Sequence, residues 1–156
     1  MKRLKLTACI AAAGLMLNPM TLSAQEASPD PRWTWDLTDL YESDEDWNEA
    51  LQEALGGLDE VRSLKGTLSE GPEALLKAFQ TNSEWALKGS RVFTYASLGA
   101  DENLGDPRGQ ERRQQAQRMF SEFQQATAWL QPEMMALGRE TLERYVRELP
   151  ELESYR

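Results

Sequence analysis

Residues 43–64 read SDEDWNEALQEALGGLDEVRSL, and this stretch decides the fold class. Ser43 suits a helix N-cap, and the three acids after it lie where the helix dipole favours negative charge. Apolar residues then recur at the three- and four-residue steps of one helix face: Trp47, Leu51, Ala54, Leu55, Leu58, Val61 and Leu64. The stretch predicts an amphipathic helix closed by Gly66, with a bend or a close helix crossing at Gly56 and Gly57.

A second helical pattern begins at residues 69–73, where Pro72 suits the first turn, and continues to about Gly99. The polar residues 81–83 inside this pattern could interrupt or recap the helix. Residues 100–107 contain Asp, Asn, Gly and Pro and predict a loop.

The remaining segments repeat the helical period. A third helix is expected over residues 107–130, Pro132 opens another that extends through Val146, and Pro150 begins a last turn. We find no strand alternation and no repeat of fixed period. The sequence therefore predicts an all-α fold, an antiparallel array of four to six helices.

The first 32 residues have the composition of a targeting segment. Lys2, Arg3 and Lys5 precede an apolar run over residues 6–17, and small residues follow near Ala24. This order is typical of a signal peptide over residues 1–24, and the run is shorter than the roughly 20 residues of a membrane span. We expect an exported chain, periplasmic or secreted, with a flexible linker at 25–32 and no stable membrane insertion after cleavage; a short uncleaved anchor is the alternative.

Residues 33–42 form an aromatic-rich extended segment before the first helix. Five of its side chains are too apolar for a free tail, and we expect them to pack onto the helical body: Trp33, Trp35, Leu37, Leu40 and Tyr41. Residues 33–156 are therefore taken as one helical unit.

The charge of the chain excludes some classes of partner. It has 17 basic and 26 acidic side chains, a net charge of −9, and residues 25–156 alone have 14 and 26, a net charge of −12. Binding to a phosphate backbone or to anionic lipid requires clustered Lys and Arg. We therefore expect no nucleic-acid partner.

The chain contains no histidine, and its one cysteine, Cys9, lies in the apolar run. It can supply no imidazole to a metal or to a nucleophile. The acidic stretches 44–46 and 101–102 lack the spacing of a calcium loop, and nothing pairs Glu49, Glu53 and Glu60 with a second group as acid and base. We assign no catalytic, cofactor-binding or metal-binding residue.

Two further sets of residues each allow a structural and a binding interpretation. Trp33, Trp35, Trp47, Trp85 and Trp129 are expected to be core residues, with an aromatic edge facing a peptide channel as the alternative. Arg108, Arg112, Arg113 and Arg118 are expected to form an exposed stripe, with docking of carboxylates or phosphates as the alternative.

Five pieces of the sequence, in their order, resemble the N-terminal region of oligoendopeptidase F, in the thimet-oligopeptidase-like group of zinc metallopeptidases. They are residues 35–41 (WDLTDLY) with Asp46-Trp47, 64–68 (LKGTL), 95–103 (YASLGADEN), Pro132-Glu133 and 149–155 (LPELESY). The resemblance implies a helical lobe that walls a channel for short peptides. It also implies zinc ligands in a later His-Glu-x-x-His segment, which has no counterpart here.

These observations support two main hypotheses. The first is the N-terminal helical lobe of an exported zinc metalloendopeptidase, inactive alone, whose partners are an oligopeptide substrate and a missing C-terminal catalytic domain. The second is a stand-alone, non-enzymatic module of the cell envelope that binds a peptide or a protein. A cation-binding acidic bundle is a third, weaker idea.

Overall fold

The computed structural model describes residues 34–155, and all regular structure in that range is helical, as predicted. The elements are α1 (Asp44–Ser63), η2 (Leu68–Glu70), α2 (Pro72–Glu102), α3 (Pro107–Thr127), α4 (Leu130–Leu137), α5 (Arg139–Glu148) and η3 (Pro150–Tyr155), where η marks a 3₁₀ helix. The predicted signal peptide, the linker and Trp33 lie outside the described residues.

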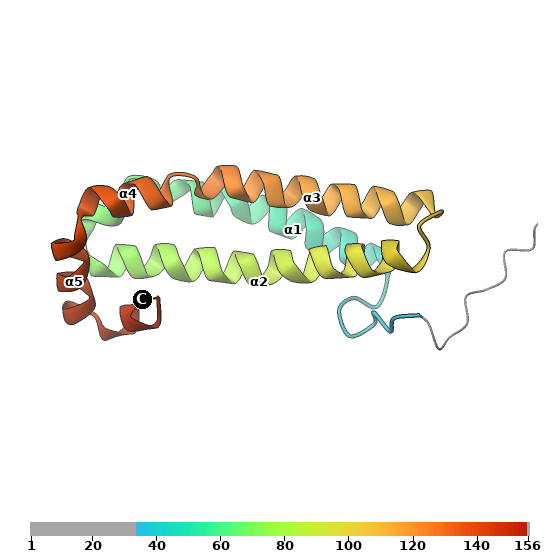
Figure 1. Ribbon diagram of the computed structural model, residues 1–156, viewed down its shortest axis with the longest axis horizontal. Coiled ribbons are helices and arrows are strands. Elements are labelled where there is room, and N and C mark those ends of the chain that lie inside the picture. The colour runs from blue at the N-terminus through green and yellow to red at the C-terminus, as the bar shows by residue number, and fades with distance from the viewer. Residues whose placement is uncertain (1–33, 156) are drawn as a thin grey trace, which may run out of the picture.

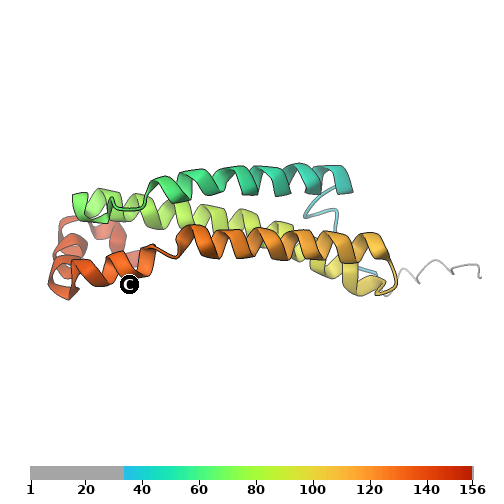
Figure 2. The ribbon, with the colours of Figure 1, turned by 90° about the horizontal axis from the view of Figure 1, so that it is seen from above.

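The three long helices form an antiparallel bundle (Figure 1). Seen from above, α1 and α3 run along the two sides of α2 (Figure 2). α4 continues roughly along the line of α3, and α5 folds across that end of the bundle (Figure 1). The segment before α1 lies at the opposite end. None of the helices between residues 34 and 155 is both long and apolar enough to cross a bilayer.

Two tryptophans fix the register between α1 and α2. The Trp47 indole N–H of α1 donates to the Val92 carbonyl oxygen of α2 at 2.9 Å. In the reverse direction, the Trp85 indole N–H of α2 donates to the Ala54 carbonyl oxygen of α1 at 2.7 Å. Both indoles are buried, so a slide of either helix would leave two buried donors without acceptors.

Trp85 also joins α3 to the other two helices. Its ring stacks on Phe123 with ring centroids 3.8 Å apart, and Phe120 meets it edge-on at 5.8 Å. A Cβ atom built on Gly57 would lie 3.6 Å from the Trp85 ring, whereas one on Gly56 would meet nothing within 4 Å. Of the two alternatives for the glycine pair, Gly57 therefore marks a close helix crossing, and α1 continues through it.

The second helix begins as predicted but ends later, and the possible interruption within it does not occur. α2 passes through residues 81–83 without interruption and ends at Glu102 rather than near Gly99. Packing explains the extension, because Ala100 is fully buried and a Cβ atom built on Gly109 of α3 would lie only 3.3 Å from its Cα. Burial at this helix contact outweighs the small helix propensities on which the sequence prediction relied.

The last predicted helices are divided differently. α3 ends at Thr127, and α4 begins at Leu130, which leaves Pro132 in the first turn of α4, where its missing N–H costs nothing. The single helix expected to extend through Val146 is instead two helices that meet at Gly138. Gly138 has φ 75° and ψ 159°, a conformation used almost only by glycine. We call this junction the Gly138 elbow.

The buried side chains form two clusters along the bundle. The central cluster contains Trp47, Leu51, Ala54, Leu58, Val61, Trp85, Val92, Ala96, Ala116, Met119 and Ala126. The end cluster contains Leu64, Leu68, Leu75, Ala78, Tyr145 and Leu152. α4 contributes no buried residue to either cluster, and α5 contributes only Tyr145.

Within residues 34–42, the two aromatic side chains Tyr41 and Trp35 are placed differently. Tyr41 lies against the central cluster and meets Tyr95 edge-on, with ring centroids 5.5 Å apart. Trp35, which was expected to be buried, has 59% of its surface exposed. Only its backbone is held, because its N–H donates to the Glu102 carboxylate at the end of α2.

Candidate functional site

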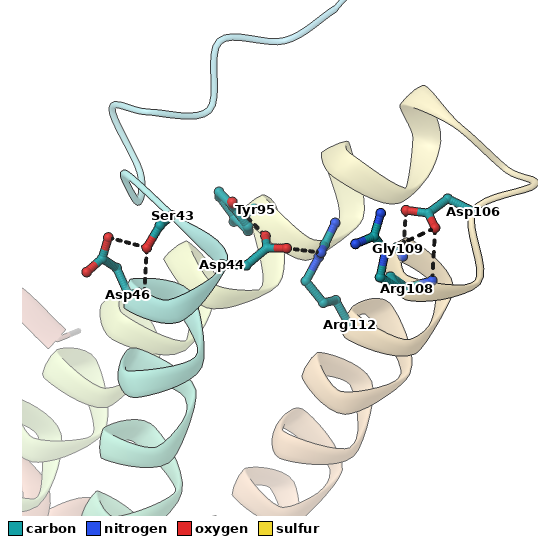
Figure 3. A network of polar contacts seen from close by, with 8 residues as sticks. All are labelled: Ser43, Asp44, Asp46, Tyr95, Asp106, Arg108, Gly109 and Arg112. Atoms are coloured by element: carbon teal, nitrogen blue, oxygen red, sulfur yellow. Dashed lines mark hydrogen bonds and ion pairs between the residues drawn. The ribbon is translucent and has the colours of Figure 1, made fainter. Parts of the chain in front are cut away.

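A polar network joins the three long helices near the start of α1 (Figure 3). Ser43 caps α1 as predicted, since its hydroxyl oxygen accepts from the Asp46 N–H at 3.1 Å. The Asp44 carboxylate accepts from the Tyr95 hydroxyl of α2 at 3.0 Å and from Arg112 of α3 at 2.5 Å. Both oxygens of Asp44 are thus engaged, and the network holds three helix ends together.

The charges of this network stabilise the contact between helices and do not form a catalytic pair. The Arg112 side chain is 19% exposed and the Asp44 side chain 53%, so water still screens the Asp44 end of this ion pair. Burial, and then the negative charge and hydrogen bond of Asp44, raise the pKa of Tyr95 above its usual value. A phenol that holds its proton more tightly, beside a carboxylate already paired with arginine, does not form an acid and base couple.

The four arginines of the predicted stripe divide into two kinds. Arg112 and Arg113 are partly buried and pair within the chain, which is neither an exposed stripe nor ligand docking: Arg112 pairs with Asp44, and Arg113 pairs with Asp101 and also donates to the Ser97 carbonyl oxygen at 2.9 Å. Arg108 and Arg118 are exposed, as expected of a solvated stripe. The carboxylates that are bound belong to this chain, so these contacts connect helices and leave no arginine cluster for a ligand.

The acidic residues of α1 are exposed along one side of the helix. Glu53 forms an ion pair with Lys88 of α2 at 2.6 Å, and this carboxylate raises the pKa of Lys88. Glu49 and Glu60 lie on the surface. Within residues 34–155, no three Asp, Glu, Cys or His side chains are close enough to hold a metal ion together. The described residues therefore do not fit a zinc site.

The tryptophans are core residues only in part. Trp47 and Trp85 lie in the central cluster as predicted, and Trp129 is half-buried against the end cluster. Trp35 is exposed. The structure therefore confirms the core interpretation for the two tryptophans whose indole groups bond across α1 and α2.

A groove between α4 and α5 is the concave feature that the sequence analysis missed. Its volume is about 630 Å³, and Gly138 lies within its lining. Its lining includes the apolar residues Met134, Met135, Leu142 and Val146, which we call the floor, and the polar or charged residues Gln131, Arg139, Glu143, Arg147 and Glu153, which we call the rim. We call it the α4–α5 groove. The signal was present in the sequence: apolar residues 142 and 146 and charged residues 139, 143 and 147 share one helix face.

Comparison with known proteins identifies relatives of the chain. No protein-family model matches it. Group B oligopeptidase PepB of Streptococcus agalactiae is 22% identical over 134 residues, which cover 86% of this chain and 22% of that protein. Oligopeptidase PepF of Bacillus subtilis is 28% identical over 122 residues, which cover 78% of this chain and 18% of that protein.

The fold agrees with the sequence comparison. The crystal structure of oligoendopeptidase-F from Enterococcus faecium superimposes with a TM-score of 0.66 and 28% sequence identity, over 72% of this chain and 22% of that one. The chain spans 18–22% of the length of the two curated relatives named above. In sequence and in fold, this chain is similar to a part of oligoendopeptidase F, as its sequence motifs predicted.

Proposed function

We propose that this chain is the N-terminal helical lobe of an exported zinc metalloendopeptidase that hydrolyses oligopeptides. The lobe shapes the substrate channel, and polypeptide outside these 156 residues performs the chemistry. One observation carries the proposal: the same residues match oligopeptidases in sequence and match an oligoendopeptidase-F structure in fold.

The bundle is built to keep its shape, which a channel wall requires. The paired indole bonds and the Asp44 network fix α1, α2 and α3 relative to one another at two separate places. A wall of fixed shape excludes folded proteins by size and admits extended peptides. In this scheme the catalytic polypeptide would hold zinc and a general base, and zinc would activate the attacking water.

A chimera tests this assignment. The 156-residue chain alone, with zinc and a fluorogenic oligopeptide, should show no cleavage. Residues 34–155 should restore cleavage when they replace the matching segment of Bacillus subtilis PepF, compared with PepF from which that segment is deleted. Cleavage by the purified chain alone, or an inactive but folded chimera, would contradict the proposal.

Export is a separate part of the proposal and rests on the sequence of residues 1–24. Expression of the full coding sequence in a bacterial host, followed by mass spectrometry of the periplasmic fraction, should find a protein that begins near Gln25. A full-length protein confined to the cytoplasm would remove this part and leave the channel role intact.

The α4–α5 groove favours a second candidate function, a peptide- or protein-binding module of the cell envelope that acts alone. Coding DNA that continues past codon 156 to a His-Glu-x-x-His segment would exclude this alternative. A stop codon after Arg156, with a stable monomeric product, would favour it over the peptidase lobe.

A further inference from the structure

We infer that the α4–α5 groove is a docking site for an amphipathic helix supplied by the catalytic polypeptide. This helix would present an apolar face to the groove, with rim charges in the order acid, base, acid at positions i, i+4 and i+8. The inference rests on the proposed function, which requires that the lobe be joined to a larger body.

The first argument is the apolar surface that the fold leaves uncovered. Five of the eight residues of α4 are apolar; Leu130, Met134 and Leu137 are partly buried against the end cluster, whereas Met135 is 75% exposed. Leu142 and Val146 of α5 are only partly buried where they line the groove. Methionine and aliphatic side chains in a concave surface of about 630 Å³ are suited to hold the bulky side chains of a partner helix.

The second argument is the charge pattern, which defines the partner. Arg139, Glu143 and Arg147 follow one another at four-residue steps along the face of α5 that lines the groove. Arg139 pairs with Glu143 at 2.7 Å, but 91% of the Arg139 side chain is exposed, so this pair contributes little and can rearrange. Glu153 of η3 adds a fourth, negative charge to the rim. Along the row on α5, the charges opposite plus, minus, plus are minus, plus, minus.

The third argument is the charge of α5 relative to the rest of the molecule. α5 has three basic and three acidic residues, whereas the whole chain has a net charge of −9. The groove is thus a nearly neutral surface on an acidic protein. A partner that is itself acidic overall could approach this end with less repulsion than it would meet elsewhere.

A second copy of the chain fits the groove less well. An antiparallel pair of α5 helices centred on Glu143 would place Arg139 opposite Arg147 and the two Glu143 carboxylates opposite each other. Two chains of net charge −9 also repel each other. A pair centred midway between Arg139 and Glu143 would instead place opposite charges together, so the repulsion between two acidic chains, rather than the rim pattern, favours a different helix over self-pairing.

Two synthetic helical peptides test the inference on the 156-residue chain. Both present leucines at positions i+1, i+5 and i+9, and their charges at positions i, i+4 and i+8 are Glu, Lys, Glu in one and Lys, Glu, Lys in the other. By calorimetry, the Glu-Lys-Glu peptide should bind about ten-fold more tightly. The triple variant Arg139→Glu, Glu143→Lys, Arg147→Glu should reverse this preference, which mere loss of folding cannot do.

Apolar variants test the floor of the groove. Met135→Lys, at a highly exposed position, should weaken binding of the Glu-Lys-Glu peptide about ten-fold. Leu87→Lys changes a residue of α2 that is 68% exposed and outside the groove lining, and it should leave binding within about two-fold. Circular dichroism confirms that each variant is folded.

Several results would overturn the inference. No binding of either peptide, or equal binding of both, contradicts the charge pattern. A chain that sediments as a dimer and becomes monomeric with Met135→Lys shows that a second copy occupies the groove. If the PepF chimera is active but the chain binds neither peptide, only the docking site is rejected. If the chimera is inactive but the chain still prefers the Glu-Lys-Glu peptide, only the peptidase role is rejected.

Discussion

At the scale of single residues, Trp85 connects more of the fold than any sequence pattern indicates. It donates to α1 through Ala54, stacks on α3 through Phe123 and is itself part of α2. Trp85→Phe should lower the free energy of unfolding by about 1–3 kcal/mol, because it removes a buried hydrogen bond and part of a stacked ring. Trp35→Phe, at an exposed position, should stay within about 0.5 kcal/mol. Urea denaturation measures both, and equal effects would contradict this account.

Two glycines should respond to alanine with opposite signs. At Gly109 a new Cβ atom would meet the Ala100 backbone, which cannot move aside, so Gly109→Ala should destabilise the protein by about 1–3 kcal/mol. At Gly56 a Cβ atom meets open space inside a helix, so Gly56→Ala should stabilise it by about 0.5–1 kcal/mol. Thermal and urea denaturation decide the signs, and a neutral Gly109→Ala would show that α2 and α3 can separate locally.

The Asp44 network makes stability depend on alkaline pH. Because burial and Asp44 raise the pKa of Tyr95 above 10.0, the folded state favours the protonated phenol. Its contribution is fully present below pH 10 and is lost as the pH rises through the folded pKa. The urea midpoint of the wild type should therefore fall between pH 9 and 11, and the fall should be smaller for Tyr95→Phe. If the urea midpoints of the wild type and of Tyr95→Phe fell equally with pH, Tyr95 would not contribute to this pH dependence.

At the scale of elements, the Gly138 elbow separates α4 from α5 and so creates the groove. Gly138→Ala places a Cβ atom in a backbone conformation reserved for glycine, and it should cost about 1–3 kcal/mol of stability. Any relief of this strain moves α5 relative to α4, so binding of the Glu-Lys-Glu peptide should weaken as well. Unchanged stability and binding would show that the elbow is not set by the glycine backbone.

The helices themselves differ in how far local sequence determines them. The start of α1 follows from the Ser43 cap and the start of α2 from Pro72, and both were predicted. The end of α2 and the division at Gly138 were not predicted. The end of α2 depends on its contact with the next helix, α3, and the division at Gly138 depends on one backbone conformation that a glycine permits but does not require.

At the scale of the whole molecule, the two clusters predict two levels of stability. The central cluster joins three long helices, whereas α4 buries no residue and α5 buries one. Amides of α5 should therefore exchange hydrogen at least about ten-fold faster than amides near Trp85 in α2. Native-state exchange followed by mass spectrometry measures this difference. Uniform protection would mean that the end of the bundle unfolds only with the rest.

The same experiment separates the groove from the bundle. Bound Glu-Lys-Glu peptide should slow exchange in α4 and α5 and leave the middle of α2 unchanged, because a ligand stabilises the segments that it contacts. Slower exchange throughout would indicate that the two clusters open as one unit.

By itself, the sequence determined the helical class, the starts of the three long helices and the resemblance to oligoendopeptidase F, because caps, periodicity and motifs are local or linear features. It also established that no histidine is available to bind zinc. Only the tertiary structure decided that Arg112 and Arg113 bind this chain's own carboxylates, that Trp35 stays exposed, and that α4 and α5 enclose a groove. Those outcomes depend on which side chains of different elements meet. A helical period predicts the face of its own helix on which a residue lies, but it does not predict the residue's partner.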